Sequence, residues 1–329
     1  MLFLTTLMMG TLISISSFSW FSMWMGLEIN MLSFIPLMNE KNNPLSSEAS
    51  LKYFIVQAIS SMIILFSFLI SLISKEILSP MNFSLELIFS SALLMKMGAA
   101  PFHFWFPEII EGISWFNTLI LLTWQKLAPM ILVMYNLNSN IFLNFVILSS
   151  LMISGLKNWN QTSIKKILAF SSINHMGWLL SIILINQSLW MFYFMFYIFV
   201  TFSLILMFKK FSMPSILDLF KILNSNKPMK LFFMLNFLSL GGLPPFLGFF
   251  PKWMILKTLW FSNHYFLALT MVFLTLIMLF VYLRILYQGM VLNVSENKMM
   301  FSNPKTMIFN FLSFCNLTGL IIFSLILNL

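Results

Sequence analysis

The stretch KMGAAPFHFWFPEIIEG, residues 96–112, places a lysine, a histidine and two glutamates around a Gly-x-x-Pro sequence. Its surroundings are apolar, with LELIFSSALLM before it at 85–95 and ISWFNTLILLTW after it at 113–124. Glycine tolerates backbone angles that other residues avoid, and proline removes a backbone donor and clashes with the preceding turn. We therefore expect an apolar helix to be interrupted here, next to ionisable side chains.

Composition indicates an integral membrane protein. Of the 329 residues, 60% are hydrophobic and 8% are charged. A soluble domain carries about 25% charged residues, so too few polar side chains remain to cover a water-soluble globule. Apolar runs recur from one end of the chain to the other, which also excludes a soluble protein with a single apolar tail.

The sequence offers no candidate site for chemistry on a soluble substrate. It has no P-loop, no Gly-x-Gly-x-x-Gly after a strand, and no Ser-His-Asp or Cys-His arrangement. The single cysteine, Cys315, excludes a disulfide within the chain and an Fe–S cluster held by four of its own cysteines. No histidine has a partner at metal-ligand spacing, so we expect no catalytic residue and no metal site. The net charge of +9 comes from lysines between apolar runs rather than from a patch, so we expect no nucleic-acid partner.

Apolar runs of helical length predict an all-α protein with eleven transmembrane helices. About 20 apolar residues cross the hydrocarbon core, and the alternating pattern of barrel strands does not occur. The first run follows no charged segment and precedes no small-residue cleavage site, so we expect a span rather than a signal peptide. The runs lie near 2–20, 22–38, 52–74, 84–110, 116–136, 141–156, 166–185, 189–208, 231–261, 265–287 and 306–326.

Basic residues predict the orientation of these spans. Only Lys75 and Lys257 fall on the side opposite the N-terminus. Thirteen fall on or near the side of the N-terminus: Lys41, Lys52, Lys157, Lys165, Lys166, Lys209, Lys210, Lys221, Lys227, Lys230, Arg284, Lys298 and Lys305. Because loops on the inner side carry the excess of Lys and Arg, the N-terminus is expected inside and the C-terminus outside.

Two segments share the pattern Gly-x-x-Pro-Phe-x-x-x-Phe-Pro. Residues 98–107 read GAAPFHFWFP and residues 242–251 read GLPPFLGFFP, in the fourth and ninth expected spans. These spans are five apart and cross in opposite directions, which is typical of inverted repeats with interrupted helices in transport proteins. A proline kink used only for packing is the alternative, and two matches at symmetric places favour the repeat.

We therefore expect one polytopic membrane domain made of two inverted five-helix repeats, at 1–140 and 141–290. A C-terminal loop and helix follow at 291–329. Carbonyls freed by a break need partners in protein, water or a polar side chain. The breaks are expected at Gly98, Pro101, Gly242, Pro244 and Pro245.

Ionisable side chains within the expected spans are functional candidates, because a charge at a helix centre costs about 2.5–3.5 kcal/mol on insertion scales. Lys96 and Lys126 lie near the middle of their spans, and Glu28 lies within the second span. A buried lysine whose carboxylate neighbour can be protonated or moved can carry protons, which makes Lys96 with Glu28 a candidate pair. A static pair that joins two helices is the alternative. Lys252 is the fourth candidate, and its alternative is a lysine that reaches the membrane surface.

Two histidines and two glutamates are further candidates. His103 and His175 can relay protons, because histidine titrates near neutral pH, and a structural bond to a backbone carbonyl is the alternative for each. Glu108 and Glu111 lie one helical turn apart and are a possible proton entrance, or a solvated helix end.

Four longer motifs resemble the chain 2 family of NADH–ubiquinone oxidoreductase, the antiporter-like membrane subunits of respiratory complex I. They are LLMKMGAAPFHFWFPE (93–108), LTWQKLAP (122–129), ILAFSSINHMGW (167–178) and SLGGLPPFLGFFPKW (239–253). The likeness runs from about residue 20 to residue 290. By this resemblance Glu28 and Lys96 match the family's charged pair and Lys126 its central connecting lysine. Lys252 matches the lysine on the second broken helix, and His175 the histidine beside that channel.

The resemblance implies a core subunit of the proton-pumping NADH:ubiquinone reductase that holds no redox or catalytic centre itself. NADH, FMN, Fe–S clusters and ubiquinone would then be bound elsewhere in the complex. Implied partners are other membrane subunits, accessory subunits and lipids such as cardiolipin. The implied location is the mitochondrial inner membrane, with the N-terminus in the matrix and the C-terminus in the intermembrane space. Bacterial members of the resembled family look longer by three N-terminal helices, and the resemblance implies that this chain shares the shorter form of animal mitochondrial relatives. The alternatives are a scaffold subunit that conducts nothing and a free-standing cation/proton antiporter.

Overall fold

The computed structural model describes residues 1–40, 43–77, 82–136, 140–211, 215, 216, 218, 227–291, 316 and 319. These residues are helical apart from short connections and an isolated β-bridge between Ser163 and Ser215. The chain divides into two compact units, Met1–Ser150 and Leu151–Leu329.

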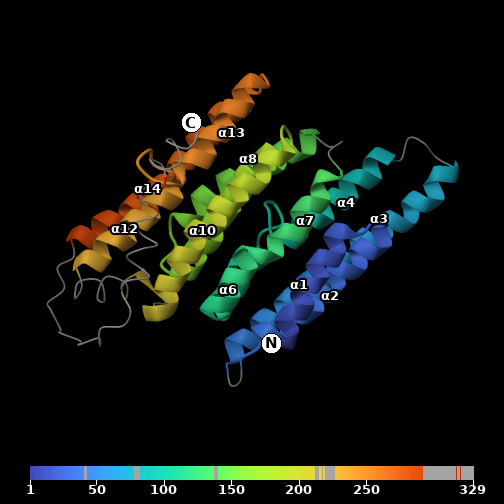
Figure 1. Cartoon of the computed structure of the whole chain (residues 1–329), viewed down its shortest axis with the longest axis horizontal. Helices are drawn as coiled ribbons and strands as arrows, with labels where there is room; N and C mark the ends of the chain where they lie inside the picture. Colours follow the sequence, from blue (N-terminus) through green and yellow to red (C-terminus); the bar gives the residue numbers. More distant parts are fainter. Residues whose placement is uncertain are drawn as a thin grey trace. The chain divides into compact units, whose positions relative to one another are not determined.

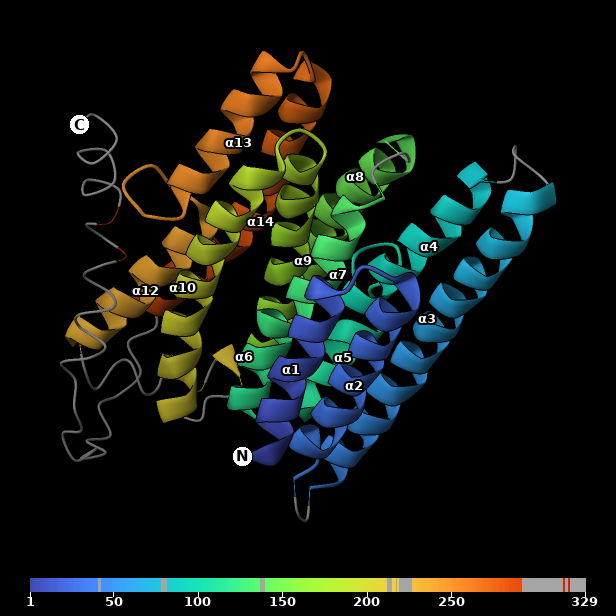
Figure 2. The ribbon, with the colours of Figure 1, turned by 45° about the vertical axis from the view of Figure 1, so that its right-hand side comes forward.

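The first unit is built from antiparallel helices, of which α1, α2 and α3 run side by side in both ribbon views (Figures 1 and 2). Shorter helices follow and pack against them, α4 against α3 and α7, and α5 against α3. The bounds are α1 Leu2–Ser16, α2 Trp20–Met38, α3 Pro44–Ile77, α4 Asn82–Met97, α5 Trp105–Gly112, α6 Trp115–Leu122 and α7 Trp124–Met134, with α8 Asn140–Asn158 crossing into the second unit.

Glycines let α1 and α2 approach each other closely. A Cβ atom on Gly26 would lie 2.6 Å from the backbone nitrogen of Ser14 and 2.8 Å from the carbonyl oxygen of Gly10. A Cβ on Gly10 would in turn lie 2.9 Å from the nitrogen of Asn30. Small residues at such contacts are typical of helix pairs in membranes, where dispersion contacts between backbones replace the hydrophobic effect.

The second unit surrounds α9 with the other helices. Of the most apolar window of α9, 94% is buried, and α9 contacts α10, α13 and α14. Figure 2 shows α12 and α13 in succession, with their connecting loop to one side. The bounds are α9 Ile164–Ile183, α10 Gln187–Phe211, α12 Lys227–Gly241, α13 Phe249–Phe261 and α14 Tyr265–Val291.

The outward surfaces are apolar, as in a multi-pass membrane protein. Within the described residues, 7 segments are long and apolar enough to cross a membrane. In the most apolar windows of the segments Pro44–Leu72 and Tyr265–Gln288, only 28% of residues are buried inside the protein. Apolar side chains that face outward on this scale need lipid or a protein partner.

Three expected spans are interrupted in the structure. The runs 84–110 and 231–261 divide into α4 with α5 and α12 with α13, at the two Gly-x-x-Pro segments. The run 116–136 also divides, at Thr123, which the sequence analysis did not predict. There the Thr123 hydroxyl donates to the carbonyl of Leu119 at 2.7 Å, and such back-bonding often bends helices.

Two further observations concern the eleven transmembrane helices expected from the sequence. The third helix begins at Pro44 rather than near residue 52. The expected span at 306–326 lies outside the described residues, except for Asn316 and Gly319.

Candidate functional site

The first break lies between α4 and α5. The helix ends at Met97, and Gly98 follows with a φ of 71°, in the left-handed region that favours glycine. A Cβ there would lie 3.1 Å from atoms of the Phe106 side chain, so the glycine also makes room for this ring. Pro101 occupies the gap, and the chain resumes a helix at Trp105.

Side chains from three helices bind the carbonyls at this break. Gln57 Nε2 of α3 donates to the carbonyl of Lys96 at 3.1 Å. Trp105 Nε1 of α5 donates to the carbonyl of Met95 at 3.2 Å. Ser149 Oγ of α8 donates to the carbonyl of Ala100, also at 3.2 Å. Unpaired carbonyls in an apolar interior cost several kcal/mol in lipid, so these contacts stabilise the broken helix.

Lys96 and Lys126 line the same cavity. Both are buried, Lys126 with only 1% of its surface exposed. The cavity has a volume of about 20 Å³ and also includes Tyr53, Gln57 and Gln125 in its lining. A cavity needs roughly 10–15 Å³ to hold one water molecule, so a single water fits between these polar groups. The Lys126 ammonium lies 5.5 Å from the centre of the Phe106 ring, within cation–π range.

Glu28 lies on α2 and is half-buried. Among the described residues, the ion pairs that Lys52 forms with Glu48 and Glu108 involve neither Glu28 nor Lys96. The pairing of Lys96 with Glu28, directly or through one water, stays a prediction.

The second break, between α12 and α13, has its own lysine. The helix ends at Gly241, and Gly242 has a φ of 78°. Lys252 of α13 folds back and donates from Nζ to the carbonyl of Gly241 at 2.9 Å. Its ammonium also lies 5.7 Å from the centre of the Trp178 ring of α9. A buried cation thus binds a carbonyl at the end of the broken helix, while Pro244 and Pro245 in the loop are exposed.

The two candidate histidines make different contacts. His175 on α9 is buried, and its Nδ1 lies 2.9 Å from the Tyr193 hydroxyl of α10. It lines a cavity of about 10 Å³ together with Tyr193, Tyr197 and Pro251 beside the second break. His103 lies in the first break, where its Nδ1 donates to the carbonyl of Pro101 at 3.2 Å. Within the described ranges, no group of three His, Cys, Asp or Glu side chains could hold a metal ion.

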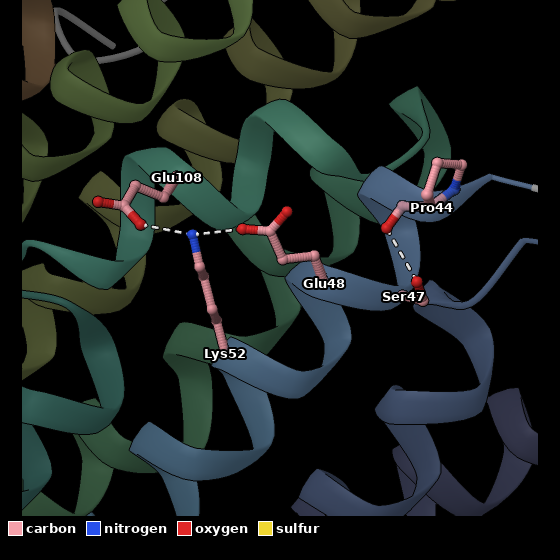
Figure 3. A network of polar contacts seen from close by, with 5 residues as sticks. All are labelled: Pro44, Ser47, Glu48, Lys52 and Glu108. Carbon is pink, nitrogen blue, oxygen red and sulfur yellow. Dashed lines mark hydrogen bonds and ion pairs between the residues drawn. The ribbon is translucent and has the colours of Figure 1, made fainter.

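Glu108 belongs to an exposed charge cluster that joins α5 to α3. The Lys52 ammonium lies 2.9 Å from a carboxylate oxygen of Glu108 and 2.9 Å from one of Glu48 (Figure 3). Exposed pairs of this kind contribute about 0–1 kcal/mol each. Glu111 is also exposed, one turn further along α5.

Several polar residues of the site were missed at the sequence level. Gln57, Gln125 and Asn30 are polar side chains within apolar runs, and this signal could have identified them. Gln125 Nε2 donates to Asn30 Oδ1 at 2.8 Å and so joins α7 to α2 beside the cavity. Tyr193, the partner of His175, could not be found in this way, because tyrosines are common in buried apolar helices.

Comparison with known proteins gives close relatives over the whole chain. A family model described as NADH:quinone oxidoreductase/Mrp antiporter, TM, matches residues 17–278. NADH-ubiquinone oxidoreductase chain 2 of Anopheles gambiae is 49% identical over 334 residues, covering 99% of this chain and 97% of that protein. The protein of the same name from Aedes aegypti is 48% identical over 331 residues, with 99% and 97% covered.

A solved structure shares the fold. A chain of respiratory complex I from Thermus thermophilus with bound Aureothin superposes with a TM-score of 0.85 at 21% identity, covering 97% of this chain and 77% of that one. At this identity the likeness shows the fold alone.

Proposed function

This chain belongs to the NADH-ubiquinone oxidoreductase chain 2 family, and we propose that it contributes a proton path to the membrane part of a proton-pumping NADH:ubiquinone oxidoreductase. The observation that carries this proposal is the placing of two buried lysines, Lys96 and Lys126, on one cavity beside a broken helix. Buried cations in an apolar chain are costly and mark ion or proton pathways by default.

The path begins on α2 and α4 in the first unit. Glu28 of α2 would act on Lys96 of α4, and a water in the cavity would pass a proton between Lys96 and Lys126. Glu108 and Glu111, both exposed, would supply protons from the aqueous side. His103, at the break, is a further relay.

The second unit, taken by itself, would contribute His175 and Lys252. His175 lies on α9 and lines the small cavity beside the second break. The Lys252 ammonium lies over the Trp178 ring of α9. The indole Nε1 of Trp178 is buried and has no hydrogen-bond partner in the part of the chain that the structure describes. A buried donor of this kind is a natural site for an ordered water.

The proposal includes the finer architecture. The first ten of the eleven spans would form two inverted five-helix repeats at 1–140 and 141–290, supported by a left-handed glycine after the helix end at each break, and the eleventh would be the C-terminal helix. The N-terminus would face the matrix and the C-terminus the intermembrane space of mitochondria. Flavin, Fe–S clusters and ubiquinone would be bound by other subunits, and accessory subunits and cardiolipin would contact the outer surface. Failure of the two repeats to superpose in an experimental structure would refute the inverted-repeat arrangement.

Substitution of Lys96 by Met tests the proton path, because it removes the titrating group and retains an apolar side chain of similar length. Proton transfer through this unit should slow by about 100-fold, as is typical when a positioned proton carrier is lost. The measurement is the ratio of protons pumped to NADH oxidised by the intact complex in proteoliposomes. Lys157→Met, an exposed lysine at the end of α8, is the matched control.

The outcomes separate the alternatives. An unchanged pumping ratio in an assembled Lys96→Met complex would support the scaffold function instead. Purification of this chain apart from any redox complex, with cation-driven proton exchange, would support a free-standing antiporter.

A further inference from the structure

A second, larger cavity lies in the first unit, away from the buried lysines. Its volume is about 290 Å³, close to the lower end of the roughly 300–1,000 Å³ typical of small-molecule pockets. The proton path does not use it. Among the described residues, its lining includes four aromatic rings (Trp20, Phe68, Phe89 and Tyr135) and the Glu86 carboxylate, beside Asn136 and two serines.

Two of the aromatic rings pack against each other beside the cavity. Trp20 of α2 packs edge to face against Phe89 of α4, with ring centres 4.7 Å apart and planes at 77°. Asn136 Nδ2 donates to the backbone carbonyl of Glu86 at 2.9 Å, which joins the end of α7 to the start of α4. The face of an aromatic ring attracts cations, and quaternary ammonium groups are bound by such cages.

All elements of the cavity meet at one end of the helices. Trp20 begins α2, Phe68 lies in the second half of α3, Glu86 lies in the first turns of α4, and Tyr135 follows the end of α7. Because these helices alternate in direction, this end is the one away from the Lys52–Glu108 cluster. Trp and Tyr concentrate where membrane helices meet water. The neighbouring surface of α3 is apolar and outward-facing, with Phe66 56% and Leu69 47% exposed.

We propose that this cavity binds the ammonium head group of a zwitterionic phospholipid, whose acyl chains lie along the exposed face of α3. The Glu86 carboxylate complements a choline or ethanolamine cation and disfavours an anionic lipid such as cardiolipin. The site is independent of the proton path.

The test uses the intact complex that contains this chain, in nanodiscs with phosphatidylcholine or phosphatidylglycerol of identical acyl chains, each carrying a diazirine near the head group. After illumination, mass spectrometry measures labelling of the peptides that contain Ser67–Leu72 and Leu85–Phe89. Phosphatidylcholine should label these peptides about fivefold more than phosphatidylglycerol, since a cation–π contact with a carboxylate nearby contributes on the order of 1 kcal/mol. This comparison needs no variant.

Variants assign the effect to the cavity. Glu86→Gln should reduce phosphatidylcholine labelling about fivefold, whereas Glu40→Gln, which removes an exposed carboxylate at the other end of α2 and α3, should not. Equal labelling by both lipids, or undiminished labelling in Glu86→Gln, would overturn the proposal. Loss of labelling on addition of millimolar choline chloride would overturn the lipid assignment in favour of a small soluble ammonium ligand.

Discussion

Substitution of Gly242 by Ala should displace Lys252 from the second break. A Cβ atom at this position would lie 2.8 Å from Lys252 Cδ and 3.0 Å from Nζ, so the side chain has to move. The backbone adds a second cost, because a φ of 78° destabilises the folded state by roughly 1–2 kcal/mol when the residue carries a Cβ atom. Lys252 would also lose its hydrogen bond to the carbonyl of Gly241, and bonds from charged donors contribute about 1.5–3 kcal/mol.

Together the backbone cost and the lost hydrogen bond amount to about 2.5–5 kcal/mol, concentrated at the break. The backbone amides of Gly242 and Leu243 both donate to the carbonyl of Leu238, so they report local opening. Each 1.4 kcal/mol is a factor of ten, and a loss of about 3 kcal/mol lowers their protection from hydrogen exchange roughly 100-fold. Exchange measured by mass spectrometry on the intact complex gives this value.

The neighbouring Gly241 is the matched control. A Cβ there would meet only side chains, with Tyr282 Cδ2 nearest at 3.4 Å, which is ordinary contact. Gly241→Ala should therefore change protection less than about threefold, with any gain of helix propensity below about 1 kcal/mol. Equal protection in both variants would show that the glycine gap does not hold Lys252 in place, and would refute the reasoning.

The remaining predictions concern the first unit. Gln57→Leu should leave the carbonyl of Lys96 without its donor and cost about 1–3 kcal/mol at the end of α4, measured as faster hydrogen exchange at Gly98 and Ala99; unchanged exchange would contradict the role of this amide. Gly26→Val should force α1 and α2 apart, because even a Cβ at this position lies 2.6 Å from the backbone of Ser14, and the amount of assembled complex on native gels should fall. Normal assembly of this variant would show that the two backbones have room to separate.

Local properties of the sequence were enough to predict the fold class and the positions of two breaks. Helical hydrogen bonds join residues four apart, so apolar runs and Gly-x-x-Pro segments act within one or two turns, and α4 and α12 end next to Gly98 and Gly242. The likeness of four motifs to a known family was likewise visible in the residues alone, and the close relatives confirm it. The bend at Thr123 was missed because a single threonine in an apolar helix carries no distinctive pattern.

Contacts between distant residues were decided only by the tertiary structure. Opposite charge predicts a pair of Lys96 with Glu28, which stays a prediction. The tertiary structure adds that Lys96 shares its cavity with Lys126, and that Gln57, 39 positions earlier, binds its carbonyl. The sequence shows Lys252 only as a lysine within an apolar run. The structure shows that its ammonium, on α13, binds the carbonyl of Gly241 at the end of α12. A sequence shows which groups need a partner, because burial of a polar group is costly for any fold. Which partner they find depends on how helices far apart in the chain pack, and that is a property of the three-dimensional arrangement.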